Sequence, residues 1–245
     1  MADPLQLLRT TLGEQLAGLR GVGVEELPPA LLDVAVERFA VGGERAASRD
    51  VSLVLPRDWE QLRHEEGGAG RPIPYWARPW PSGLELAGAL ADDPTMVSAG
   101  ARVLELGCGR GAPSVVAARA GAEVLATDGA PDAVAFAAHN LALTGVTAEV
   151  AHVDWAAHGE ALVARGPFDV LLAADVLYLQ ANVEIALRLW PRLLKDDGVL
   201  LLADPRRAGT RDFLAAARGT FDLVSERRGD DVALHTLRPC RPPAR

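Results

Sequence analysis

Ten residues decide the fold of this chain: Val103-Leu104-Glu105-Leu106-Gly107-Cys108-Gly109-Arg110-Gly111-Ala112. A short apolar run passes into a glycine-rich turn and then into a helical pattern, so we expect a strand, a tight loop and a helix. Glycine lets the backbone approach a ligand without a Cβ in the way, and the following helix offers free N–H groups. We therefore predict a ligand site at Gly107, Gly109 and Gly111.

After this loop, short apolar runs alternate with helical patterns. The predicted strands cover 102–106, 123–127, 148–153, 169–174, 199–203, 222–227 and 232–238, and the predicted helices cover 113–120, 131–144, 181–194 and 210–218. Strands separated by helices favour a parallel sheet, but the last two strands are too close for a crossover helix. The predicted fold class is α/β: a Rossmann-like seven-stranded, mainly parallel sheet with an antiparallel final hairpin and helices on both faces.

Two carboxylates near the loop indicate which ligand it binds. Asp128 ends the next strand about 20 residues after the first glycine, the usual offset of an acid that binds a ribose diol. Gly107, Gly109 and Ala112 also satisfy the dinucleotide pattern, which leaves a nicotinamide cofactor open. Glu105, however, suits the ammonium of a methionine moiety better than a pyrophosphate. We therefore predict S-adenosylmethionine as the cofactor.

Asp154 and Trp155 follow the third predicted strand of the sheet. There a carboxylate and an amide edge can read the N6 group of adenine while the indole packs on its ring. Plain structural roles stay open at this point, because Glu105 and Asp154 are also suited to cap a helix.

Residues 1–70 are predicted to form an N-terminal extension, and residues 71–245 the S-adenosylmethionine-binding methyltransferase domain. Apolar periodicity predicts helices over 3–19 and 29–39 and a strand over 51–55. Glycines, prolines and aromatics over 65–81 indicate a linker or an ordered loop. The extension is suited to serve as a lid or a substrate platform.

Three further motifs occur in order: Pro74-Tyr75-Trp76-Ala77-Arg78-Pro79-Trp80-Pro81-Ser82-Gly83, Asp175-Val176-Leu177-Tyr178 and Asp204-Pro205-Arg206-Arg207. They resemble the lead-in segment, the (D/E)-x-x-(Y/F) signature and the D-P-G-R element of the seven-strand lysine methyltransferases. The chain looks closest to the electron-transfer-flavoprotein β-subunit lysine methyltransferases, over roughly two-thirds of its length. It departs from them at Arg206, which replaces a glycine, and at Leu179-Gln180, which replace a frequent acidic pair.

The resemblance implies methyl transfer to an amine, with Asp175 and Tyr178 as the catalytic pair. Asp175 would accept a hydrogen bond from the amine, and Tyr178 would orient it. Aromatic faces favour a sulfonium or an ammonium by cation–π attraction. The other expected site residues are Trp80 and Ala174 for the cofactor, and Tyr75, Trp76 and Asp204 for the substrate.

Composition narrows the class of protein. A formal net charge of −8 argues against a broad basic surface for nucleic acid, so we expect a protein or small-molecule methyl acceptor as the partner. No apolar run reaches the roughly 18–20 residues of a membrane helix, and Met1-Ala2-Asp3-Pro4 shows no signal-peptide pattern. With two cysteines, one of them Cys108 in the loop, we expect a cytoplasmic protein. The scattered histidines predict no metal site.

The predicted function is S-adenosylmethionine-dependent N-methylation of a protein lysine or a small amine. The alternative is a small-molecule O- or C-methyltransferase of a biosynthetic pathway, for which the extension would supply a deeper lid. A non-catalytic binding module would have no need of the intact glycine loop, Asp128 and Asp175. A nicotinamide oxidoreductase is the remaining enzyme alternative, and a measurement of cofactor binding would distinguish it from a methyltransferase. The sequence does not define the oligomeric state.

Overall fold

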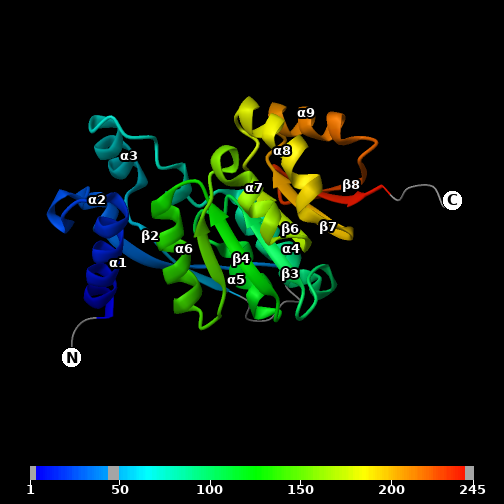
Figure 1. Cartoon of the computed structure of the whole chain (residues 1–245). Coiled ribbons are helices and arrows are strands. Elements are labelled where there is room, and N and C mark those ends of the chain that lie inside the picture. The colour runs from blue at the N-terminus through cyan, green and yellow to red at the C-terminus, as the bar shows by residue number, and fades with distance from the viewer. Residues whose placement is uncertain (1–3, 44–49, 241–245) are drawn as a thin grey trace.

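Strand β3 (Arg102–Leu106) leads into the glycine loop from the interior of a seven-stranded sheet in the computed structural model, which describes residues 4–43 and 50–240 (Figure 1). The strand order is β5-β4-β3-β6-β7-β9-β8. The other strands are β4 (Glu123–Asp128), β5 (Glu149–His152), β6 (Phe168–Ala174), β7 (Leu194–Asp204), β8 (Phe221–Arg228) and β9 (Val232–Pro239). The strands β5, β4, β3, β6 and β7 pair in parallel with one another, whereas β9 runs antiparallel to both β7 and β8. The predicted parallel sheet with a final hairpin is confirmed.

Helices cover both faces of this sheet because successive strand residues point to opposite sides. One face packs against α4 (Pro81–Asp92), α5 (Ala112–Arg119) and the end of α6 (Pro131–Leu143). The other face packs against α7 (Trp155–Arg165), α8 (Gln180–Leu193) and α9 (Ala208–Ala217). Trp190 and Phe213, both fully buried, meet on that second face with ring centroids 5.1 Å apart.

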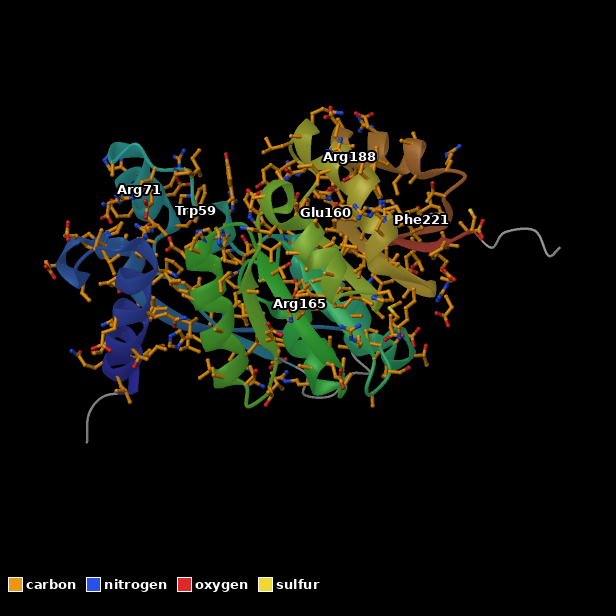
Figure 2. The ribbon with its side chains drawn as sticks, in the orientation of Figure 1. Trp59, Arg71, Glu160, Arg165, Arg188 and Phe221 are labelled. Atoms are coloured by element: carbon orange, nitrogen blue, oxygen red, sulfur yellow. The ribbon has the colours of Figure 1, made fainter. Side chains whose placement is uncertain are left out.

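Helices α1 (Pro4–Arg20), α2 (Pro29–Leu32) and α3 (Trp59–Gly68) lie at the α6 end of the molecule, away from α8 and α9 (Figure 1). Strands β1 (Val34–Phe39) and β2 (Val51–Pro56) extend from this end toward α4 and α5, and Val51 and Leu53 pack in the same apolar cluster as those helices. α1 and β2 both contact α6, and they form one apolar cluster with Phe136 of that helix. Trp59 and Arg71 lie at this end and Phe221 lies at the opposite end (Figure 2).

Two sequence-based predictions differ from the structure, and some helices were not predicted at all. The helix predicted over 29–39 is wrong, because helix α2 ends at Leu32 and Val34–Phe39 form strand β1. The β-branched residues of β1 pair with β2 in a two-stranded sheet, from Val34 opposite Pro56 to Phe39 opposite Val51, and this tertiary pairing overrides the weak helical pattern. The predicted loop over 65–81 begins inside α3 and ends in α4. Helices α3, α4 and α7 were not predicted.

Short 3₁₀ turns complete the chain at Val24–Glu26, Tyr75–Ala77 and Pro94–Met96. The first helix was expected from residue 3, which lies outside the described residues. Over residues 4–43 and 50–240, every helix is too short or too polar to cross a bilayer.

Candidate active site

The glycine loop turns sharply between β3 and α5. Gly107, Gly109 and Gly111 all have positive φ, at 71°, 52° and 77°. A Cβ at Gly107 would lie 2.5 Å from Cγ1 of Val176, so this position excludes any side chain as well as requiring a left-handed backbone. The loop is closed by hydrogen bonds from Cys108 N to the Thr127 carbonyl and from Gly111 N to the Cys108 carbonyl, both 2.8 Å long.

Asp128 clamps this loop from the end of β4. Its Oδ2 accepts a hydrogen bond from Gly109 N at 2.8 Å, and its Oδ1 accepts one from Ala130 N at 2.8 Å. Burial raises the pKa of Asp128 above its usual range, although these backbone N–H groups oppose the shift. An ionised carboxylate accepts about four hydrogen bonds, so Asp128, which lines the cavity, retains acceptor capacity beyond these backbone bonds.

Glu105 lies beneath the loop and is 2% exposed. Its Oε2 accepts hydrogen bonds from Ser114 N at 3.0 Å and from the Ser114 hydroxyl, and Ser114 is in the first turn of α5. The capping role that the sequence left open is therefore present. Burial raises the pKa of Glu105 to about 8, in spite of these bonds. Burial thus favours the protonated carboxyl, and a cation beside it would favour the ionised form.

Asp154 and Trp155 both line the cavity beside the glycine loop. Asp154 is the N-cap of α7 and accepts a hydrogen bond from Ala157 N at 2.9 Å, so this residue also caps a helix. The Trp155 indole meets Trp190 edge-on at 5.7 Å and so packs into the core. Ala174, at the end of β6, is a further lining residue.

Asp175 follows β6 directly and is 9% exposed. Its backbone is left-handed, with φ at 57°, and its N–H donates to the Ala203 carbonyl at 2.9 Å. Its carboxylate forms a two-point ion pair with Arg207, from Nε to Oδ1 at 2.5 Å and from Nη2 to Oδ2 at 3.1 Å. Burial raises the pKa of Asp175 above its usual range, and the guanidinium opposes that shift.

Tyr178 lies at the mouth of the cavity and is 49% exposed. Burial of its hydroxyl, together with the carboxylates of Asp128 and Asp175, raises the pKa of Tyr178. Its ring lies 6.1 Å from the ring of Tyr75, which lies 6.3 Å from that of Trp80. Trp80 also donates from its indole nitrogen to the Tyr75 carbonyl at 2.7 Å. These aromatics therefore form one wall of the mouth.

Of the three expected substrate residues, Tyr75 lies in this aromatic wall, whereas Trp76 and Asp204 have other surroundings. The Trp76 ring packs against Phe136 at 4.8 Å, within the N-terminal cluster, although the residue also lines the cavity. Asp204 is fully buried and lies outside the set of lining residues. Its Oδ1 accepts a hydrogen bond from Arg207 N at 2.6 Å, and its Oδ2 has no partner among the described residues. Asp204 thus holds the arginine that contacts Asp175.

One cavity of about 950 Å³ joins these groups, a size at the upper end for ligand sites. Every expected site residue except Asp204 lines it. Sequence reasoning missed its N-terminal wall, where Arg20 of α1 bonds Glu66 of α3 at 2.7 Å and also contacts Asp132 of α6. Arg71 contacts the same Glu66 carboxylate. No local sequence signal links these residues, because Arg20 and Asp132 are 112 positions apart.

The described part of the chain holds no group of three or more His, Cys, Asp or Glu side chains placed to bind a metal ion. Cys108 and Cys240 are free thiols. Burial raises the pKa of Cys108 well above its usual value, so this thiol is unsuited to act as a nucleophile.

Known proteins share both the sequence and the fold of this region. The electron transfer flavoprotein beta subunit lysine methyltransferase of Xenopus laevis is 35% identical over 139 residues, which are 55% of this chain and 54% of that protein. The ubiquinone biosynthesis O-methyltransferase of Xanthomonas oryzae pv. oryzae is 38% identical over 126 residues, which are 50% of this chain and 51% of that protein. The chain therefore spans about half the length of these curated relatives.

Among solved structures, a TehB-like SAM-dependent methyltransferase from Corynebacterium glutamicum superposes with a TM-score of 0.50 and 21% identity, over 74% of this chain and 96% of that one. This similarity shows the Rossmann-like fold. The family model described as a methyltransferase domain matches residues 97–227, which include the glycine loop, Asp128, Asp175 and Arg207. Since that match covers more than half of the chain, the protein belongs to this family of S-adenosylmethionine-dependent methyltransferases.

Proposed function

We propose that this chain is an N-methyltransferase that methylates a protein lysine or a small amine. One observation carries the proposal: the Asp128 clamp of the glycine loop and the Asp175–Tyr178 pair line the same cavity. The expected cofactor site at Asp128 and the expected acceptor site at Asp175 lie at the carboxyl ends of β4 and β6, the parallel strands on either side of β3. Open α/β sheets bind their ligands at this edge.

The residues around the loop fit S-adenosylmethionine. Gly107, Gly109 and Gly111 line the cavity without a Cβ, so a ligand can approach their backbone closely. Asp128 retains acceptor capacity for ribose hydroxyls. The bonds to Glu105 use Oε2 alone, so its Oε1 is suited to accept from an ammonium. Asp154 and Trp155 flank the place expected for adenine, and Trp80 and Ala174 complete the proposed cofactor contacts.

When bound, S-adenosylmethionine supplies an electrophilic methyl group on a positively charged sulfur. The chain's own part is to hold the acceptor nitrogen in line with that methyl group. The Asp175 carboxylate accepts a hydrogen bond from the acceptor N–H, and the Tyr178 hydroxyl limits how the acceptor turns. The Tyr75, Trp80 and Tyr178 rings keep water from the mouth and so favour the neutral, nucleophilic amine.

The rim of the cavity supports an acceptor that approaches from solution with apolar neighbours. Several large apolar side chains that are more than a third exposed line this one cavity: Leu19, Val22, Ile73, Tyr75, Tyr178 and Leu179. Contiguous exposed apolar surface around a pocket is typical of a site that meets another molecule. Residues 1–70 supply part of that rim, so we propose the N-terminal extension as a substrate platform for the methyltransferase domain at 71–245.

A small-molecule O-methyltransferase is the second candidate, favoured by the 38% identity to the ubiquinone biosynthesis enzyme. We propose that this protein is cytoplasmic, since Cys108 is a buried free thiol. We propose no nucleic acid as acceptor, because the net charge is −8.

Calorimetric titration tests the cofactor half of the proposal. Wild-type protein should bind S-adenosylmethionine in the micromolar range and give no heat with NADH. Asp128→Asn should weaken that binding at least tenfold, while Glu123→Gln, at the opposite end of the same strand, should leave it unchanged. Absence of binding to the wild type would contradict the methyltransferase function, and heat with NADH would favour an oxidoreductase.

Radiolabelled methyl transfer then distinguishes the two candidate functions, N-methylation of an amine and O-methylation of a small molecule. The label is offered with three acceptors: n-butylamine, a lysine-containing protein extract and a catechol. Label in N-methylbutylamine, or in Nε-methyllysine after hydrolysis, supports N-methylation. Label in the catechol ether alone would replace the proposal by the O-methyltransferase alternative.

A further inference from the structure

Two non-glycine residues adopt a left-handed backbone at one edge of the sheet. In the chain as far as it is described, Asp175 (φ 57°) and Arg206 (φ 64°) are the non-glycine residues with positive φ. Such conformations are unfavourable for residues with a Cβ, persist only where the surroundings impose them, and gather at functional sites. Asp175 follows β6 and Arg206 follows β7, which are paired parallel strands, so both residues lie at the same sheet edge.

Both turns serve a single ion pair. The turn at Asp175 brings its carboxylate to Arg207, whose Nε and Nη2 each bond one carboxylate oxygen, at 2.5 and 3.1 Å. The turn at Arg206 lets the next residue begin α9, with its backbone N–H bonded to Asp204 Oδ1 at 2.6 Å. Arg207 is therefore held at its backbone by one buried carboxylate while its side chain holds another.

We propose that Arg207 is a positioning residue for methyl transfer, which fixes both carboxylate oxygens of Asp175 in one orientation at the cavity wall. This inference rests on the proposed function, in which Asp175 orients the acceptor. Arginine suits the task because its planar fork matches a carboxylate at two points, whereas the ammonium of lysine is a single point charge. Arg207 itself lies outside the set of lining residues, so it acts through Asp175.

The Arg207 guanidinium has a second effect, which is to keep the Asp175 carboxylate ionised. Asp204 faces Asp175 from β7 and raises its pKa, and Arg207 is the cation that opposes it. Tyr178 lies on the same loop. Burial, Asp128 of β4, Asp175 and Tyr75 raise the pKa of its hydroxyl, and Arg207 lowers it. Without the guanidinium, burial and the neighbouring carboxylates would act unopposed and Asp175 would take up a proton at higher pH. A protonated carboxyl loses part of its acceptor capacity for an incoming N–H group.

Carbon-13 NMR of aspartate-labelled protein measures the first consequence directly, with the Asp175 signal assigned from Asp175→Asn. In Arg207→Gln the midpoint of the Asp175 titration should rise by about 1–3 pH units. Arg207→Lys keeps the charge, so the Asp175 midpoint should rise by less than about half as much as in Arg207→Gln. Arg206→Gly is the matched control: it removes an exposed arginine of the same loop, whose contact is Asp231, and should leave the midpoint unchanged.

Methyl transfer measures the second consequence, with n-butylamine or the protein extract, whichever the wild type methylates. Both Arg207→Gln and Arg207→Lys should lower kcat on the order of 10- to 100-fold, because misplacement of a reacting partner by about 1 Å has effects of this size. The Kd for S-adenosylmethionine should change less than about twofold. The acid limb of the pH profile should move upward in Arg207→Gln only.

An unchanged Asp175 midpoint in Arg207→Gln would overturn the proposal, and so would full kcat in Arg207→Lys. Equal loss of cofactor binding and kcat would also overturn it, because that result indicates a merely structural role. If the wild type binds no S-adenosylmethionine while the midpoint still rises in Arg207→Gln, the proposed function fails and the ion pair stands.

Discussion

Asn140 and Arg110 are joined by a hydrogen bond of 2.9 Å, from the side-chain amide of α6 to the carbonyl of the glycine loop. The same side chain reaches the N-terminal hairpin, because Val54 N donates to Asn140 Oδ1 at 2.6 Å. Asn140 is fully buried. A single amide therefore ties β2 of the extension to the backbone that is expected to cradle the cofactor.

Replacing this amide should cost stability. Asn140→Leu leaves the Val54 N–H and the Arg110 carbonyl without the partner they have in the fold, and an unsatisfied buried polar group costs about 1–3 kcal/mol. We expect urea unfolding to show a loss of about 2 kcal/mol, with weaker S-adenosylmethionine binding. Gln61→Ala is the control, since the exposed Gln61 side chain bonds Glu65 in its own helix. Equal stability of Asn140→Leu and wild type would contradict the role of this amide.

Gly107 and Gly145 form a matched pair, since both have φ at 71°. A Cβ at Gly145 meets nothing within 4 Å, whereas a Cβ at Gly107 meets Val176 at 2.5 Å. Gly145→Ala should therefore cost only the left-handed backbone, about 1–2 kcal/mol. Gly107→Ala should cost about 1–3 kcal/mol more through overpacking and should abolish cofactor binding. Thermal unfolding and calorimetry of the two variants measure the difference, and similar losses would mean that Val176 moves aside freely.

Glu105 should make stability depend on pH. Burial raises the pKa of Glu105 from 4.5 to about 8, so the folded protein keeps a proton that the unfolded chain releases. Folding stability therefore falls as pH rises between these two values, by up to about 1.4 kcal/mol per pH unit, and is level above them. Glu105→Gln keeps an acceptor for Ser114 but does not titrate, so its stability relative to wild type should increase with pH across that window.

Denaturant unfolding at pH 5, 6, 7 and 8 measures this difference, and the titrations of Asp128 and Asp175 cancel because both proteins share them. Glu123→Gln, which replaces an exposed acid, should run parallel to the wild type at every pH. A constant difference between Glu105→Gln and wild type would show that Glu105 is ionised in the folded protein.

Arg20 should matter more for stability than an exposed arginine. Its guanidinium contacts Glu66 and Asp132, and the three side chains are 17%, 3% and 14% exposed. Arg20→Met leaves Asp132 without this cation and Glu66 with Arg71 alone, and about 3–5 kcal/mol is typical when a buried ion pair loses one partner. Arg63→Met, which breaks an exposed pair with Glu60, should cost less than about 1 kcal/mol. Chemical unfolding compares the two, and equal losses would contradict a stabilising role of the buried cluster.

The local pattern of the sequence determined the core of this protein. Alternating apolar residues and short spacings predicted all seven strands of the main sheet and its final hairpin, because periodicity and loop length act within a few residues. The glycine loop and Asp128 were equally readable, since a tight turn admits only certain residues. Helix α1 and strand β2 were also predicted, whereas β1, α3, α4 and α7 were not.

Tertiary structure alone decided the rest. The sequence pattern favoured a helix over Val34–Phe39, and only pairing with β2 makes this segment a strand. Arg207 meets Asp175 from 32 positions away, and Arg20 meets Asp132 from 112 positions away. Such ion pairs form because parallel strands end at one edge and α1 packs on α6, which brings together charges that no local pattern relates. Local sequence patterns therefore specify the backbone of the glycine loop. The packing of distant elements specifies which side chains surround that loop.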